Sequence, residues 1–206
     1  MKLQTIIFIS RSGGGKGTQI KKLMDYIKEK DSSEVFHMES GPKFRDFIKG
    51  TTYASKLAKK VNDTGELQPS FLSIWTWTNL FIDQIDDTKH VIIDGTPRRI
   101  SEARVLDEAL QFFGRENMAV VYLNVSKEKS IERIKSRYSD EDSNKKRDDD
   151  SQMDVIRKRL EWFETDVLPV VDFYKTHQKY RFIEVDGERP VDEVHAEIIK
   201  ELGDMD

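Results

Sequence analysis

The chain has 206 residues and a mass of 24.1 kDa, which is enough for one domain with its own hydrophobic core. It contains no cysteine, which excludes disulfides, thiolate metal sites and a cysteine nucleophile. Its net charge of −4 argues against a general nucleic-acid binder, since such proteins are usually basic. No apolar run approaches the ~20 residues of a membrane span, and the first residues lack the pattern of a signal peptide. We therefore expect a soluble, cytoplasmic protein with no nucleic-acid or membrane partner.

Short apolar runs that predict strands alternate with longer segments whose apolar residues have helical spacing. The predicted strands are, in chain order, 5–10, 35–38, 90–94, 118–125 and 181–185. The predicted helices are 16–28, two short helices within 44–61, then 71–85, 101–113, 127–137, a long helix over 152–175, and 191–202. This alternation predicts an open parallel sheet with helices on both faces, which binds its ligands outside the carboxyl ends of the strands.

The predicted helix over 71–85 is rich in aromatic residues. Phe71 and Trp75 are four residues apart, as are Trp77 and Phe81. Side chains four apart share one helix face, so we interpret all four as packing residues rather than as a surface for stacking bases.

The first predicted strand leads directly into a glycine-rich segment, residues 10–19, which a predicted helix follows. This order is typical of a phosphate-binding loop, because glycines let several backbone N–H groups point at one anion and the helix adds the positive end of its dipole. Lys16 would reach the transferred phosphoryl group, and the Thr18 hydroxyl would bind Mg²⁺. Ser10 stands where the full motif has glycine, and a merely flexible turn is the alternative. The cradle would consist of Gly13, Gly14, Gly15 and Gly17.

The third predicted strand ends in the sequence Asp-Gly-Thr-Pro-Arg-Arg, residues 94–99. An acid at a strand end beside a phosphate loop can orient Mg²⁺ through its bound waters, which gives Asp94 a role. A helix N-cap is the alternative function for this carboxylate.

The two motifs together, residues 14–19 and 94–98, resemble those of the nucleoside monophosphate kinases, and of the adenylate kinases most closely. The resemblance covers essentially the whole chain in the same order. It implies a single α/β domain with the three-layer P-loop NTPase fold, whose five-stranded parallel sheet has helices on both faces. An NMP-binding insert over 39–69 and a short lid over 138–147 would interrupt a core formed by 1–38, 70–137 and 148–206.

For the acceptor, Ser40 and Arg45 resemble the family's Thr-Gly-x-x-x-Arg, which holds the monophosphate. Residues 65–69 resemble its Gly-x-Leu/Ile-Val-Pro segment, which lines the base. The resemblance also brings Arg147, at the far edge of the lid, and Arg159 onto the phosphates. The implied acceptor site is Ser40, Arg45, Glu66, Leu67, Gln68, Gly95, Arg98, Glu102, Arg147 and Arg159.

For ATP, the resemblance adds three arginines to the glycine loop: Arg133, Arg137 and Arg189. The last lies in a segment, 186–190, similar to the family's loop that touches the donor adenine. Arginine suits this chemistry, because its planar fork binds phosphate oxygens in pairs and stays charged at any working pH. The implied catalytic residues are Lys16, Arg98, Arg137, Arg147 and Arg159.

The implied reaction is the reversible transfer of the γ-phosphoryl group of ATP to AMP, which gives two ADP. A phosphate oxygen of the acceptor attacks directly, so no side-chain nucleophile is needed. Mg²⁺ would be held by Thr18 and, through water, by Asp94. The lid has no cysteine and no pair of histidines, so we expect no structural zinc. We also expect a monomer.

Three residues depart from the resembled pattern in the acceptor site. Glu102 takes the place of a glutamine that reads the adenine edge, and an ionised carboxylate can only accept hydrogen bonds. It could take the exocyclic amino group of adenine or cytosine, and it would suit the two donors of guanine. Thr96 and Gln68 also change the pocket. GMP, CMP, UMP or a deoxy form therefore stays open as the acceptor, as does a non-catalytic nucleotide-binding regulatory protein.

Overall fold

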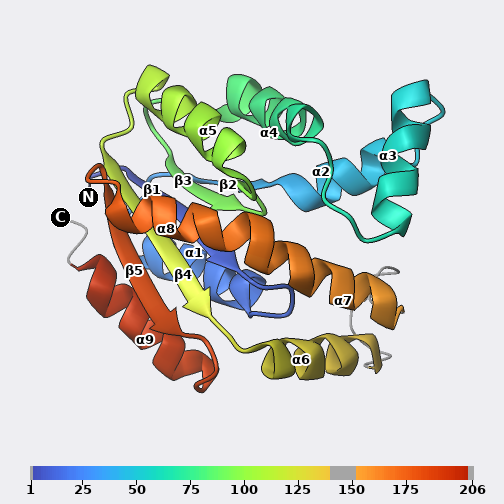
Figure 1. Ribbon diagram of the computed structural model, residues 1–206. Helices are drawn as coiled ribbons and strands as arrows, with labels where there is room; N and C mark the ends of the chain where they lie inside the picture. The colour runs from blue at the N-terminus through green and yellow to red at the C-terminus, as the bar shows by residue number, and fades with distance from the viewer. Residues whose placement is uncertain (1, 140–151, 204–206) are drawn as a thin grey trace.

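The computed structural model describes residues 2–139 and 152–203 (Figure 1). In that part of the chain, five strands form one parallel sheet in the order β2-β3-β1-β4-β5. The strands are β1 (Gln4–Ser10), β2 (Val35–Glu39), β3 (His90–Asp94), β4 (Asn117–Asn124) and β5 (Tyr180–Asp186). The register pairs Phe8 of β1 with Asp94 of β3, so the exit of β1 lies beside the acid that ends β3. The predicted α/β fold with a five-stranded parallel sheet is confirmed.

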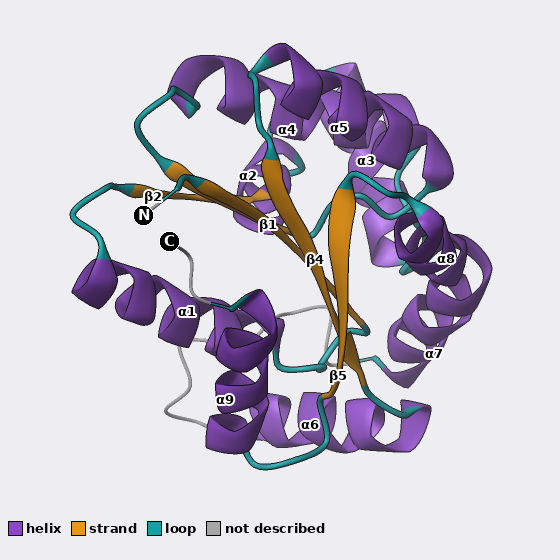
Figure 2. Ribbon diagram, turned by 90° about the vertical axis from the view of Figure 1, so that its left-hand side faces the viewer, coloured by secondary structure: helices purple, strands orange, loops and turns teal. Residues whose placement is uncertain are grey.

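Helices cover both faces of the sheet, which makes three layers (Figure 2). One face carries α1 (Lys16–Lys30) and α9 (Val191–Leu202), and the other carries α4 (Ser70–Gln84), α5 (Ile100–Phe112) and α8 (Leu168–Thr176). Successive strand residues point to opposite faces. Ile6 and Phe8 accordingly pack in the cluster under α1 and α9, whereas Ile7 and Ile9 pack in the cluster under α4, α5 and α8.

Two short helices, α2 (Ser40–Phe47) and α3 (Tyr53–Asp63), project from the sheet directly after β2 (Figure 1). They occupy the segment predicted as two helices broken near residues 50–52. Thr52 caps α3, because its hydroxyl accepts a hydrogen bond from the Ser55 N–H at 3.1 Å. Few of their side chains are buried, so other parts of the chain must hold them in place.

The long helix predicted over 152–175 is present but is not uniform. It consists of α7 (Met153–Trp162), a π-helical turn η2 (Phe163–Val167) and α8. A π-turn widens the helix and changes the direction of the side chains that follow, and such turns are frequent at functional sites. Helix α6 (Lys127–Ser139) packs against α7 through Ile134, Ile156 and Leu160.

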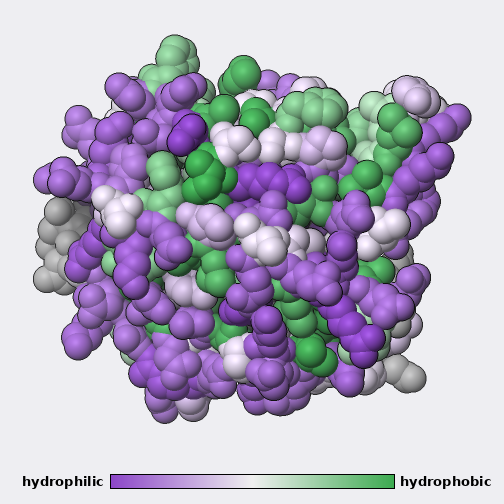
Figure 3. Space-filling model, viewed as in Figure 1, coloured by the Kyte–Doolittle hydropathy of each residue, from purple (hydrophilic) through white to green (hydrophobic). Residues whose placement is uncertain are grey.

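The aromatic residues of α4 divide between core and surface. Trp77 and Phe81 are buried in the core, as predicted. Trp75 packs on Phe47 of α2, with ring centroids 5.1 Å apart. The prediction was wrong for Phe71, which is 71% exposed because it lies in the first turn of the helix, beyond the sheet. Figure 3 shows a largely hydrophilic face on which apolar side chains gather over α4 and toward α3. None of the helices within residues 2–139 and 152–203 is both long and apolar enough to cross a membrane.

Candidate active site

The glycine loop between β1 and α1 lies at the carboxyl edge of the sheet, where sequence reasoning placed it. Gly15 has a φ of +90°, a conformation that residues with a side chain rarely adopt. A Cβ on Gly14 would lie 1.8 Å from the Ser10 Oγ, so a larger residue there would force the loop or Ser10 to shift. The geometry of the loop therefore favours glycine at positions 14 and 15.

Arg11 anchors this loop, and sequence reasoning did not single it out. Its guanidinium is buried, donates to the Val125 carbonyl at 2.9 Å, and forms an ion pair with Glu164. It also lies 4.4 Å from the centroid of the Phe163 ring. Partial burial would raise the pKa of the Glu164 carboxyl, but Arg11 and Lys127 outweigh it and keep that pKa below its ordinary value. Arg11 thus ties the loop to the exit of β4 and to the π-turn.

Lys16 and Asp94 meet at the mouth of the loop, although 78 residues separate them in the sequence. The Lys16 Nζ donates to the Ser10 carbonyl at 3.3 Å and lies 4.0 Å from the Asp94 Oδ1. Both side chains remain partly exposed, so a bound phosphate can reach them. Thr18 is exposed in the first turn of α1. A hydroxyl and a carboxylate are the hard oxygen donors that Mg²⁺ prefers, so the residues present fit that ion.

The remaining donor-side residues lie on α6 and after β5. The Arg133 Nη1 lies 3.8 Å from the point where a Cβ on Gly15 would be, so the Arg133 guanidinium lies beside the loop. Arg137 follows one turn later on the same helix and is partly exposed. Arg189 forms an ion pair with Glu197 of α9 and lies 4.0 Å from Asp186.

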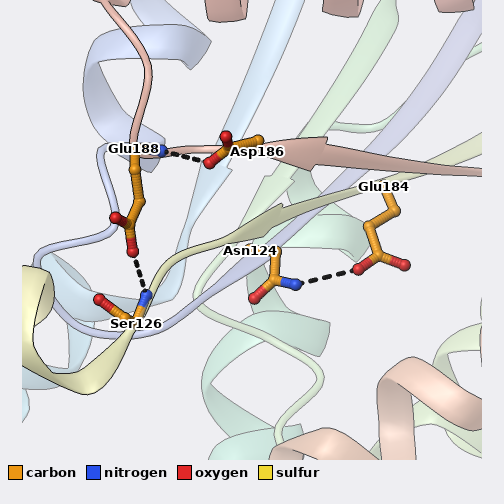
Figure 4. Close-up of a pocket in the computed structure, with 5 residues that line it drawn as sticks. All are labelled: Asn124, Ser126, Glu184, Asp186 and Glu188. Atoms are coloured by element: carbon orange, nitrogen blue, oxygen red, sulfur yellow. Dashed lines mark hydrogen bonds between the residues drawn. The ribbon is translucent and has the colours of Figure 1, made fainter.

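A hollow of about 370 Å³ opens at the carboxyl ends of β4 and β5 (Figure 4), and the segment that resembles an adenine-contacting loop forms part of its lining. Asn124 donates to Glu184 at 3.0 Å, and the Ser126 N–H donates to Glu188 at 2.7 Å. The hydrogen bonds from Ser126 lower the pKa of Glu188, so the carboxylate stays ionised and fixes the start of α6. The lining residues are Asn124, Ser126, Glu184, Asp186 and Glu188.

On the acceptor side, the insert touches the loop that follows Asp94. The Ser40 hydroxyl donates to the Asp94 carbonyl at 3.5 Å and would lie 2.7 Å from a Cβ on Gly95. Gly95 therefore lets α2 approach the loop closely, since its φ is +88° as well. The Arg45 guanidinium lies over Gly41 at the start of the same helix. These contacts bring two of the predicted acceptor motifs together.

Glu102 is buried beneath this loop, with 1% of the residue exposed. Its Oε2 accepts hydrogen bonds from the Arg98 backbone N–H at 2.9 Å and from the Thr96 hydroxyl at 3.4 Å. The carboxylate therefore holds the segment that presents Arg98. Sequence reasoning assigned Glu102 only to the acceptor base.

Residues 65–68 close the acceptor side. The Gln68 side-chain amide donates to the Ala58 carbonyl of α3 at 2.9 Å, and the Gln68 backbone carbonyl accepts from the Arg99 guanidinium. Glu66 is exposed, and Leu67 is partly buried. The Gln68 side chain thus hydrogen-bonds within the insert itself. The sequence motif did not indicate this contact.

Two predicted site residues lie on the helices before and after the predicted lid, Arg137 on α6 and Arg159 on α7. Each lies three residues beyond a member of the apolar cluster that packs these helices together, Ile134 and Ile156 respectively. Arg147, and most of the predicted lid over 138–147, lie outside the described residues.

Comparison with known proteins decides the family. The family model for adenylate kinase matches residues 8–179 of this chain. The chain belongs to the adenylate kinase family. It is 31% identical to adenylate kinase 1 of Nostoc sp. over 198 residues, which covers 96% of this chain and 98% of that protein. It is 33% identical to an adenylate kinase of Mycolicibacterium vanbaalenii over 202 residues, with coverage of 96% and 98%.

A third relative, an adenylate kinase of Xanthomonas euvesicatoria pv. vesicatoria, is 32% identical with the same coverage. Membership in the adenylate kinase family makes this chain a phosphotransferase that acts on a phosphate acceptor, and it confirms the P-loop NTPase fold.

Proposed function

We propose that the chain catalyses the reversible, Mg²⁺-dependent transfer of the ATP γ-phosphoryl group to AMP, which yields two ADP. The observation that carries this proposal is the meeting of Lys16 and Asp94, 4.0 Å apart, where the phosphate loop faces the loop of Arg98. A donor site and an acceptor site would thereby share one edge of the sheet. The family of the chain supports the same reaction.

Each part of the site has a task in this reaction. The backbone N–H groups of residues 13–18 cradle the ATP phosphates, and Lys16 follows the group in transfer. Arg98 and Arg45 bind the acceptor phosphate, while Arg133 and Arg137 contact ATP. Thr18 and, through water, Asp94 would hold Mg²⁺ beside the phosphates, where the ion would supply positive charge to the phosphoryl oxygens.

The domain has two parts that serve binding. The insert over 39–69 receives the acceptor, and the lid over 138–147 closes with Arg147 and Arg159 on the phosphates. Closure excludes water, which would otherwise compete with the acceptor for the phosphoryl group.

AMP is proposed as the acceptor, and the position of Glu102 offers the test of the base. Its Oε2 accepts from the Arg98 N–H, and a glutamine would keep an oxygen for that bond while gaining an N–H for the base. If AMP is the acceptor, Glu102→Gln will keep or improve its use. If GMP is the acceptor, the same change will reduce activity.

The first experiment supplies ATP and Mg²⁺ with AMP, GMP, CMP, UMP or dTMP, one at a time, and quantifies the diphosphate products. Dominant formation of ADP from AMP is the expected result. Preference for another monophosphate would keep the reaction and change the acceptor. Tight ATP binding without turnover on any acceptor would contradict the proposal and favour a regulatory nucleotide-binding protein.

A further inference from the structure

One side chain, that of Trp162, touches both the acceptor arginine and the acceptor insert. Its indole N–H donates to the Gly65 carbonyl at 3.0 Å, across 97 residues of sequence. The centre of the Arg98 guanidinium lies 5.4 Å from the centroid of its ring. No feature of the sequence pattern had assigned Trp162 a role.

The stacking arrangement suits an arginine that must bind phosphate. Tryptophan offers the most favourable ring face for a cation. The guanidinium is planar and donates its hydrogen bonds within its own plane. A contact between the cation and the ring uses none of these N–H donors, so it restrains the group without competing with phosphate for them.

Trp162 itself stands on a rigid support. It is the last residue of α7, and the π-turn begins at Phe163, which is buried in the core under Arg11. In the same turn, Asp166 accepts from the Arg99 guanidinium at 2.9 Å. The neighbours Arg98 and Arg99 are thus both held by this stretch of helix, one through a ring face and the other through an ion pair.

We infer that Trp162 is a positioning residue for the acceptor: it holds the Arg98 guanidinium at the acceptor phosphate and ties the insert to that arginine through Gly65. The inference rests on the proposed function, because it assumes that Arg98 binds the acceptor phosphate. It adds a residue that couples the acceptor insert to α7.

Two variants separate the two contacts. Trp162→Phe keeps an aromatic face for Arg98 and loses the N–H that reaches Gly65, whereas Trp162→Leu loses both. We expect the KM for the acceptor to rise about threefold in the first and about tenfold in the second. The KM for ATP should stay within about twofold in both, since the hydrogen bond and the ring–cation contact of Trp162 within the described residues are with Gly65 and Arg98, on the acceptor side.

Phe182→Leu is the matched control. Phe182 lies in β5, partly buried, with the Lys175 ammonium 6.0 Å from its ring centroid, and it is not part of the site. This variant also removes an aromatic ring beside a cation and should leave both KM values unchanged. Circular dichroism and thermal unfolding show whether each variant is folded.

A second readout does not depend on turnover. Binding of the acceptor should change the tryptophan emission of the wild-type chain, because Arg98 engages the phosphate above the Trp162 ring. Trp162→Phe should lose most of that change, and calorimetry gives the acceptor affinity of each variant. Retention of the full emission change together with an unchanged acceptor KM would overturn the inference, as would an equal rise in both KM values.

The two proposals fail in different measurements. The wild-type chain alone decides the proposed function, and every variant is then tested with the monophosphate that the wild type uses best. A wild-type chain that neither binds nor phosphorylates any of the five would overturn the proposed function and this inference with it.

Discussion

The phosphate loop and the acceptor insert are held by different kinds of contact. The loop is built from contiguous residues, and its shape depends on glycines at positions where a Cβ would clash or φ is positive. The insert buries few side chains of its own. It is held by Arg99 and Trp162, which reach it from other parts of the structure. Damage to the loop should therefore abolish the chemistry, whereas damage to the supports of the insert should weaken binding of one substrate.

The largest expected effect comes from the donor half. Lys16→Ala removes the ammonium at the mouth of the loop, and we expect kcat to fall about 10³-fold because a preorganised charge is lost where charge develops. The unfolding temperature should change little, since the Lys16 side chain is partly exposed. Steady-state kinetics and thermal unfolding test this.

Lys22→Ala is the control for this change. Lys22 lies on the same helix and pairs with Asp192 of α9 instead of facing the loop. It should retain wild-type kcat, and a Lys16→Ala enzyme within tenfold of wild type would remove Lys16 from the catalytic set.

The shape of the loop can be broken without changing any charge. In Gly14→Ala the new Cβ would lie 1.8 Å from the Ser10 Oγ and 2.9 Å from the Ser10 Cβ, so the loop must shift. A shift of about 1 Å in a site of this kind costs about 10²-fold in rate.

Ser10→Gly removes both of those atoms. The double variant Ser10→Gly/Gly14→Ala should therefore have a rate at least tenfold higher than that of Gly14→Ala. Ser10→Gly alone should stay close to the wild-type rate. Absence of rescue in the double-variant kinetics would show that the clash with Ser10 is not the cause.

This contrast explains what the sequence could predict. Alternating apolar runs located all five strands, and the motifs around Lys16 and Asp94 indicated the candidate site, because such signals are local. The ion pair of Arg11 with Glu164 and the contacts of Trp162 join residues about 60 to 150 positions apart. Hydrophobic periodicity indicates which face of a helix or strand a residue occupies, but not which distant residue it contacts. It therefore could not predict these contacts or the π-turn.

A smaller effect on activity should follow from breaking an ion pair that supports the acceptor side of the site. Asp166→Asn keeps the size of the side chain and breaks the ion pair with Arg99, which also donates to the Gln68 carbonyl. Both partners are partly exposed, so we expect a loss of about 1 kcal/mol in stability and a rise of about threefold in the acceptor KM.

Asp172→Asn, an exposed aspartate on α8, is the matched control and should change neither quantity. If Asp166→Asn raised the KM for ATP rather than that for the acceptor, the division of the site into two halves would need revision.

The smallest effect on catalysis is expected at the opposite edge of the sheet. Asp31 accepts hydrogen bonds from the Ser33 N–H at 2.9 Å and the Ser33 hydroxyl at 3.0 Å. The His90 Nδ1 accepts from the Gln4 N–H, so its Nε2 carries the proton and donates to Asp31 at 3.1 Å. These bonds, those from Ser33 foremost, lower the pKa of Asp31 from 3.8 to about 2.

Because the folded pKa is the lower one, the ionised carboxylate stabilises the fold fully above about pH 4, and that contribution is lost as the pH falls toward 2. Asp31→Asn should therefore lower the unfolding temperature at pH 5, and the gap to wild type should narrow steadily between pH 4 and pH 2. A gap of constant size over that range would show that Asp31 acts through its shape and not its charge. At neutral pH the variant should keep wild-type kcat and both KM values. Asp31 contacts His90 at the start of β3, whereas Asp94 lies at the other end of that strand, so the change is remote from the site.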